Sequence, residues 1–174
     1  MVGAMNILAL EFSTETASLA LLADGAVAVA QPVDAGQRRS QELFAAAADL
    51  LRGAGWTFAG VEAFAVGRGP GSYTGLRVSL TAANGWALPA NKPVWTVSSG
   101  AALAAEVFAE RPDLHQVVVS GDARRGLVWA GRFERDARHL VRQAGEWKLL
   151  PADARGREWP EAHWVAAGRA PKAE

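Results

Sequence analysis

The residues best suited to chemistry lie in a glycine-rich stretch and in two acidic turns. The stretch Gly67–Arg77 reads Gly-Arg-Gly-Pro-Gly-Ser-Tyr-Thr-Gly-Leu-Arg. Glycine and proline disfavour the middle of a regular element, so this stretch starts as a loop. Ser72 or Thr74 can cap the free N–H groups of a helix that follows, and arginines lie on both sides. Such a corner can hold an anion such as phosphate.

An anion site is one of two interpretations of this loop. Its spacing differs from the Gly-Lys-Ser/Thr ending of a Walker loop and from the Gly-x-Gly-x-x-Gly of a dinucleotide fold. A glycine-rich turn can also serve backbone geometry alone, and the spacing by itself favours that interpretation. If an anion or a nucleotide binds, its ligands would come from the loop and from the two turns: Glu11, Ser13, Gly69, Gly71, Ser72 and Asp122.

The acidic residues of the two turns are Glu11 and Asp122. Glu11 ends an apolar run, just before the polar turn 12–16. Asp122 begins the sequence Asp-Ala-Arg-Arg-Gly, where an aspartate more often forms local hydrogen bonds than a binding site. The three histidines lack metal-ligand spacing and Gly-x-Ser-x-Gly is absent. We therefore expect neither a metal site nor a catalytic nucleophile.

The elements that position these residues follow from hydrophobic periodicity. Apolar runs predict strands over residues 6–11, 17–22, 26–31, 61–66 and 93–98. Helical spacing predicts helices over 40–53, with Ser40 as its cap, over 73–88 and over 100–110. Three strands followed by alternating helices and strands, joined by right-handed crossovers, predict a ribonuclease-H-like mixed sheet. This α/β sheet is the half-unit of the actin, Hsp70 and sugar-kinase superfamily.

The pattern starts again near residue 111. Strands are predicted over 115–120, 125–133, 140–149 and 163–167, with a helix after Pro151. We expect a first domain over 5–110 and a second, truncated copy of the same unit over 111–174. Four of the seven tryptophans would seal the thin core of this second domain: Trp129, Trp147, Trp159 and Trp164.

The helix predicted over 73–88 has a small, apolar back. Leu76, Leu80, Ala83 and Ala87 would face the sheet. The back comprises Gly75, Val78, Ser79, Ala82, Gly85 and Trp86. A helix buried on one side only should be polar on its back, so another helix must approach this one closely. That second helix belongs either to the same chain or to another subunit, and the residues alone leave both open. An interface would also include Ala45 and Ala48 of the first helix.

The composition narrows the class of protein. The 174 residues carry a formal net charge of zero, so any contact with RNA needs a local patch or a partner. The chain has no cysteine, which excludes a disulfide scaffold and thiolate chemistry. It has no apolar run of about eighteen residues, so we expect neither a membrane span nor a membrane partner, and its start does not look like a secretion signal.

Four segments together resemble the TsaB (YeaZ) family in their order and spacing. They are Asn6–Glu11, Gly67–Arg77, Val97–Ser99 and Asp122–Gly126 with the following Val128-Trp129. The resemblance covers residues 5–170. It implies a bacterial cytoplasmic protein of actin-like fold that is needed to make threonylcarbamoyladenosine next to the anticodon of tRNA.

The resemblance also implies a division of labour. In the family, a paralogue called TsaD does the chemistry through a metal-binding histidine pair that this sequence lacks, and an ATPase called TsaE joins them. This chain would be a non-catalytic partner that forms homodimers in isolation and meets tRNA only through the complex. It would need no cofactor alone, with ATP or ADP at a complex interface. The interface interpretation of the helix back is favoured accordingly.

The competing hypothesis is an actin-like nucleotide-dependent phosphotransferase or hydrolase. Its site would comprise Glu11, Ser13, Gly71 and Asp122. The family usually has Asp-Thr where this chain has Glu11-Phe12, which weakens a phosphate or metal role there. It usually has His-Ser in place of Arg39-Ser40, and it continues with a final helix and a Tyr-Leu-Arg motif. We therefore expect the second domain to be incomplete.

Overall fold

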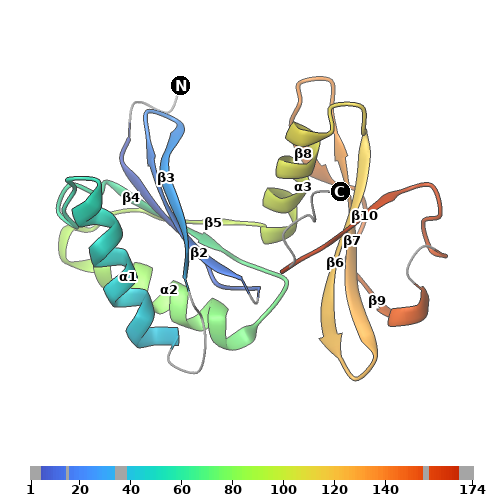
Figure 1. The fold of residues 1–174 in the computed structure, drawn as a ribbon, viewed down its shortest axis with the longest axis horizontal. Coiled ribbons are helices and arrows are strands. Elements are labelled where there is room, and N and C mark those ends of the chain that lie inside the picture. The colour runs from blue at the N-terminus through green and yellow to red at the C-terminus, as the bar shows by residue number, and fades with distance from the viewer. Residues whose placement is uncertain (1–4, 15, 34–38, 155–156, 169–174) are drawn as a thin grey trace. The chain divides into compact units, whose positions relative to one another are not determined.

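The chain folds as two compact units, each with its own sheet (Figure 1). The structure is a computed structural model that describes residues 5–14, 16–33, 39–154 and 157–168. Unit 1 is Met1–Val97 and unit 2 is Ser98–Glu174. The predicted boundary after residue 110 is thus displaced. Helix α3, Ser99–Glu110, belongs to unit 2 because its apolar side packs on the second sheet.

Unit 1 contains a five-stranded mixed sheet in the order β3-β2-β1-β4-β5. Strands β1, β2 and β3 form an antiparallel meander, and β4 and β5 extend it in parallel with β1. The strands are β1 Ile7–Glu11, β2 Ala17–Ala23, β3 Ala26–Val33, β4 Ala63–Gly67 and β5 Val94–Val97. The helices are α1 Arg39–Gly53 and α2 Tyr73–Ala87, followed by the 3-10 turn η1 Leu88–Ala90. This order confirms the predicted ribonuclease-H-like sheet.

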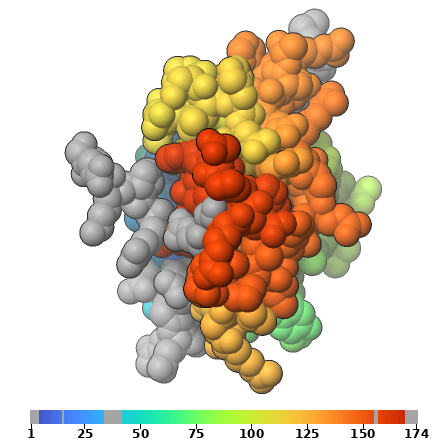
Figure 2. Space-filling view, turned by 90° about the vertical axis from the view of Figure 1, so that its right-hand side faces the viewer, coloured from blue at the N-terminus to red at the C-terminus, as the bar shows by residue number. Residues whose placement is uncertain are grey.

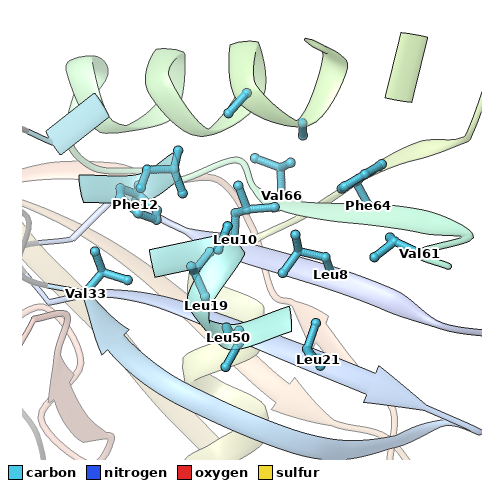
Figure 3. Close-up of a cluster of buried hydrophobic side chains, with 14 of the residues drawn as sticks. Leu8, Leu10, Phe12, Leu19, Leu21, Val33, Leu50, Val61, Phe64 and Val66 are labelled. Atoms are coloured by element: carbon cyan, nitrogen blue, oxygen red, sulfur yellow. The ribbon is translucent and has the colours of Figure 1, made fainter. Parts of the chain in front are cut away.

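The core of unit 1 lies between this sheet and the two helices. Alternate residues of the strands point to the same side and are buried there, as Leu8 and Leu10 of β1 show. Figure 3 shows them in one cluster with Leu50 of α1 and Phe64 of β4. Because side chains alternate along a strand, a register slip of one residue would turn this apolar set toward water. The pattern therefore fixes the strand register.

The helix starts follow local capping chemistry. The Ser72 hydroxyl accepts the Gly75 N–H at 3.2 Å, which confirms Ser72 as the cap of α2. The Ser98 hydroxyl accepts the Ala101 N–H at 3.3 Å at the start of α3. Helix α1 begins at Arg39, so Ser40 lies in its first turn and the prediction that it precedes the helix as the cap is wrong. In the part of the chain that the structure describes, no helix is long and apolar enough to cross a membrane.

Unit 2 repeats the first four strands of unit 1. The sheet order is β10-β6-β7-β8, with β9 also paired to β7, and β10 runs parallel to β6 as β4 does to β1. The strands are β6 Gln116–Arg124, β7 Leu127–Arg135, β8 Val141–Gln143, β9 Lys148–Pro151 and β10 His163–Ala166. The strand predicted over 140–149 is in fact two strands, interrupted where Gly145 adopts a φ of 92°. The helix predicted after Pro151 is a single 3-10 turn, η2 Ala152–Ala154.

An indole ring joins α3 to the sheet of unit 2. Trp147 packs with Phe133 at a ring-centroid distance of 5.5 Å. A Cβ added at Gly100 of α3 would lie 2.6 Å from the Trp147 ring, and one at Gly131 of β7 would overlap the same ring. The two glycines therefore make room for the indole. Of the four tryptophans expected to seal this core, Trp129 and Trp147 pack on it, whereas Trp159 and Trp164 pack on each other at a ring-centroid distance of 5.8 Å.

The turn from β7 to β8 is closed by a carboxylate. Asp136 accepts the N–H groups of Leu140 at 2.9 Å and Arg138 at 2.8 Å, and Arg142 lies 3.1 Å away. The Leu140 hydrogen bond is the main cause that holds the pKa of Asp136 below its usual range, with smaller contributions from the Arg138 N–H and the Arg142 charge.

This lowered pKa predicts an acid-sensitive contribution to stability. The ionised carboxylate stabilises the fold above the unfolded-state pKa of about 3.9, and that stabilisation is lost as the pH falls through the lower folded-state pKa. Asp136→Asn should therefore lower the melting temperature at neutral pH and lose that effect in acid. Thermal unfolding followed by circular dichroism over the acid range measures this. An equal difference at both ends of the range would contradict the assignment.

Candidate functional site

The glycine-rich loop of unit 1 is locked against the turn that follows β1. The Ser72 N–H donates to the Ser13 carbonyl oxygen at 2.6 Å. A Cβ at Gly71 would lie 2.7 Å from the Ser13 carbonyl carbon and would overlap its oxygen. Because both contacts are with backbone atoms, only glycine permits this approach. Gly71 therefore has a structural reason to be glycine.

Glu11 lies folded against the same loop. Its Oε1 accepts the Ser13 N–H at 2.6 Å. A Cβ at Gly67 would lie 2.6 Å from the Glu11 carboxylate carbon, so the absence of a side chain at Gly67 provides the space for this carboxylate. The carboxylate is half-buried and engaged with the turn.

These contacts occupy donors that an anion would use. At the start of α2, the Ser72 N–H donates a hydrogen bond to the Ser13 carbonyl oxygen. The Gly75 N–H donates to the Ser72 hydroxyl. The Glu11 carboxylate and the Ser13 carbonyl add negative potential beside the loop, which opposes a second anion. The geometry supports the structural interpretation of this loop more than the anion-binding one. Gly69, with a φ of 77°, shapes the turn.

Asp122 lies in unit 2, where its role is also local. Its Oδ1 accepts the Arg124 N–H at 2.7 Å in the β6–β7 hairpin. This is the local hydrogen bonding that the sequence favoured. Asp122 is exposed, and its carboxylate helps to hold the turn.

The small back of α2 faces α1 of the same chain. Gly75, Ser79 and Ala82 are buried, and the Ser79 hydroxyl donates to the Gly75 carbonyl oxygen at 3.1 Å. Trp86 is half-buried and packs edge-on against Phe44 of α1 at 5.4 Å. The second helix that the small residues admit is therefore α1. Unit 1 itself buries Gly75, Ser79 and Ala82, whereas Trp86 stays half-exposed, so a subunit interface that includes these four residues remains a prediction.

The buried side of α2 also differs from the predicted one. Leu80 was expected to face the sheet, but it is 43% exposed. The buried sector centres between the two predicted faces, on Ser79 and Ala83. The helix is thus buried by the sheet and by α1 together.

The outward side of the α1–α2 pair presents a small, uncharged surface. We call it the outer face, and it consists of Ala45, Ala48, Val78, Thr81 and Gly85. Three of these residues are exposed, while Ala48 and Val78 are half-buried. At about 100° per residue, the three α2 members share one sector on the side away from the buried Ala83. A Cβ at Gly85 would meet no atom within 4 Å.

The outer face retains part of the predicted interface. Ala45, Ala48 and Val78 were among its predicted residues, whereas Thr81 was missed because a threonine does not stand out as apolar. Phe44, 50% exposed on α1, lies beside this surface. Small side chains let another helix approach closely. The exposed ion pair of Asp49 and Arg52 borders this surface on α1. The arrangement suits helix packing rather than catalysis.

Comparison with known proteins gives consistent matches along the chain. A family model described as TsaD: tRNA N6-adenosine threonylcarbamoyltransferase matches residues 27–169. The tRNA threonylcarbamoyladenosine biosynthesis protein TsaB of Escherichia coli (strain K12) is 33% identical over 132 residues, covering 76% of this chain and 56% of that protein. TsaB of Haemophilus influenzae is 35% identical over 135 residues, with 76% and 55% covered. The chain thus spans about half the length of these curated relatives.

The match to a solved structure covers a larger share of both chains than the matches to the curated relatives do. YeaZ from Pseudomonas aeruginosa has a TM-score of 0.78 and 32% identity, over 94% of this chain and 75% of that chain. This chain belongs to the TsaB (YeaZ) family. The resemblance predicted from the sequence and the actin-like fold class are thereby confirmed.

One departure of this TsaB-family chain now has a structural explanation. Phe12, where the family usually has threonine, is fully buried in the core of unit 1. The preceding Glu11 reaches the Ser13 N–H through its longer side chain. The pair Glu11-Phe12 therefore fits a turn held by packing. The side chains of Arg39 and Ser40 lie outside the described residues.

Proposed function

We propose that this TsaB-family chain supports threonylcarbamoyl modification of tRNA as a non-catalytic partner of a TsaD-like paralogue. The outer face carries the proposal, since its five residues are small and uncharged and lie on two helices whose other sides build the core. The TsaD family model matches most of this chain, so the paralogue has the same fold and its own equivalent helix pair. Two such pairs can pack about a pseudo-twofold axis. A second copy of this chain would take the same place in isolation.

The glycine loop supports a role without chemistry. A nucleotide-dependent phosphotransferase or hydrolase would need an available acid and free donors at the loop. Here Glu11 is engaged with Ser13, and Ser72 with Ser13 as well. We therefore place the transfer reaction on the TsaD-like paralogue and ATP hydrolysis on a TsaE-like ATPase, in the cytoplasm. ATP or ADP would bind at an interface of that complex.

Gly85→Arg should prevent capture of the TsaD-like paralogue while leaving the fold intact. A side chain at Gly85 meets no atom within 4 Å, and arginine is a better helix former than glycine. At an interface, the guanidinium would be buried without a partner at a cost of roughly 3 kcal/mol, which is more than about a hundredfold in Kd. Calorimetric titration of the purified chain with the purified paralogue measures the loss.

Gly53→Arg is the matched control. Gly53 ends α1, a Cβ there also meets no atom within 4 Å, and the residue lies outside the outer face. This variant adds the same charge and should bind the paralogue like the wild type. Equal affinities of Gly85→Arg and Gly53→Arg would refute docking through the outer face.

A further inference from the structure

Two hairpins of this chain turn with nearly the same backbone but with different residues. The β2–β3 hairpin turns through Asp24 and Gly25, with φ values of 54° and 80°. The β6–β7 hairpin turns through Arg125 and Gly126, with φ values of 54° and 75°. Left-handed φ at both central positions is typical of a type I′ turn, which favours Asn or Asp followed by Gly. The first hairpin follows that preference, but Arg125 does not.

A second arginine in the same hairpin is also left-handed. Arg124 has a φ of 66°, and the strand register shifts between Asp122 and Arg124. Such a φ is uncommon for residues other than glycine, asparagine and aspartate. Asp122 holds the conformation by accepting the Arg124 N–H. Two consecutive arginines thus occupy left-handed positions that glycine, asparagine or aspartate would adopt more readily.

Both arginines present their charge to solvent. Arg124 and Arg125 are exposed, and neither takes part in an ion pair among the described residues. In Figure 1, the tip of the β6–β7 ribbon is the end of that ribbon farthest from α3. Figure 2 shows the light-orange tip protruding at the lower edge. Both arginines therefore lie at the turn that ends the β6–β7 ribbon of unit 2.

We propose that this hairpin tip, residues 122–126, binds phosphates of the tRNA backbone. A guanidinium stays charged and matches phosphate oxygens with a planar set of donors. The chain has a formal net charge of zero, so a local pair of arginines contributes a contact rather than general attraction to RNA. The inference rests on the proposed function in one respect, because tRNA is the polyanion of that reaction. It departs from the expectation that the chain meets tRNA only through the complex, because the tip itself would contact the RNA. It also revises the role of Asp122, which positions the arginines instead of binding the anion.

The double variant R124G/R125N removes both positive charges but keeps the backbone conformation of the turn. Glycine and Asn-Gly suit the observed backbone, so the melting temperature should stay the same or rise. The affinity for an unmodified tRNA transcript, measured by fluorescence anisotropy at low salt, should fall roughly tenfold. The slope of log affinity against log salt should shrink by about two. The control R52Q/R138Q removes two exposed charges elsewhere and should keep most of the affinity.

Each other outcome would overturn the inference. Equal affinities of the two double variants, or no salt-dependent tRNA binding by the wild-type chain, would show that the tip is not an RNA contact. Displacement of tRNA by ATP and magnesium would assign the arginines to a nucleotide instead. If R124G/R125N lost the TsaD-like paralogue but kept tRNA, the tip would be a contact for an acidic protein. Failure of the wild-type chain to bind the paralogue would refute the proposed function alone and leave the tRNA result standing.

Discussion

Gly71→Ala should destabilise unit 1 by roughly 3 kcal/mol. The added methyl group would overlap the Ser13 carbonyl group, with its carbon 2.7 Å away. The methyl group of alanine has no alternative rotamer and the Ser13 carbonyl belongs to the backbone, so no side-chain rotation relieves the contact. The hydrogen bond from the Ser72 N–H to Ser13 would have to open, which separates the loop from the turn. Urea unfolding followed by circular dichroism measures the loss.

Two other glycines of unit 1 provide a graded comparison. Gly85→Ala adds the same methyl group where no atom lies within 4 Å, and should stabilise α2 by about 0.5–1 kcal/mol. Gly67→Ala collides with the end of the Glu11 side chain, which can rotate away, so it should cost less than Gly71→Ala. If Gly71→Ala proved as harmless as Gly85→Ala, the interlocked loop would be wrong.

Phe133→Ala should unfold unit 2. Phe133 is fully buried and packs with Val117 and Phe108 in the small core beneath α3. Removing a buried phenyl ring costs about 3–5 kcal/mol, which is comparable to the whole stability of many domains. Trp147 packs on this ring, so its fluorescence should shift to that of a solvent-exposed indole at low urea concentration.

Phe64→Ala makes the same change in unit 1. Phe64 is fully buried under α2, with its ring 6.0 Å from that of Trp86. It should destabilise unit 1 and leave the packing of Trp147 in place. A wild-type fluorescence spectrum and urea midpoint in Phe133→Ala would contradict the assigned core of unit 2.

The sheet of unit 1 could be predicted because its signals are local. Short apolar runs, the Asp24-Gly25 turn and alternating helices constrain the strand order to β3-β2-β1-β4-β5. The cap of α2 could be predicted only as one of two residues, Ser72 or Thr74, because both can accept a backbone N–H at a helix start. Membership of the family could be predicted because each of its motifs is a short, continuous stretch of sequence.

The burial of α2 could not be predicted because it depends on distant residues. The helix has two overlapping apolar faces, and only the position of α1 decides that Ser79 and Ala82 are covered. Helix α3 posed the same problem, since its apolar side could have packed on either sheet. The contact of Trp147 with Gly100 and Gly131 joins three segments far apart in the sequence. The unusual arginine turn does leave a signal in the sequence, because Arg125-Gly126 takes the place that Asp24-Gly25 has in the other hairpin.

We propose that this chain acts by docking and not by chemistry. The most direct test is the threonylcarbamoyladenosine content of tRNA, measured by nucleoside mass spectrometry in native cells that carry Glu11→Gln or Gly85→Arg in place of the wild type. Glu11→Gln keeps an acceptor for the Ser13 N–H but removes the charge that a metal-bound nucleotide would need. We predict wild-type content with Glu11→Gln and a large loss with Gly85→Arg. Loss with Glu11→Gln and full content with Gly85→Arg, both variants being folded, would contradict the claim.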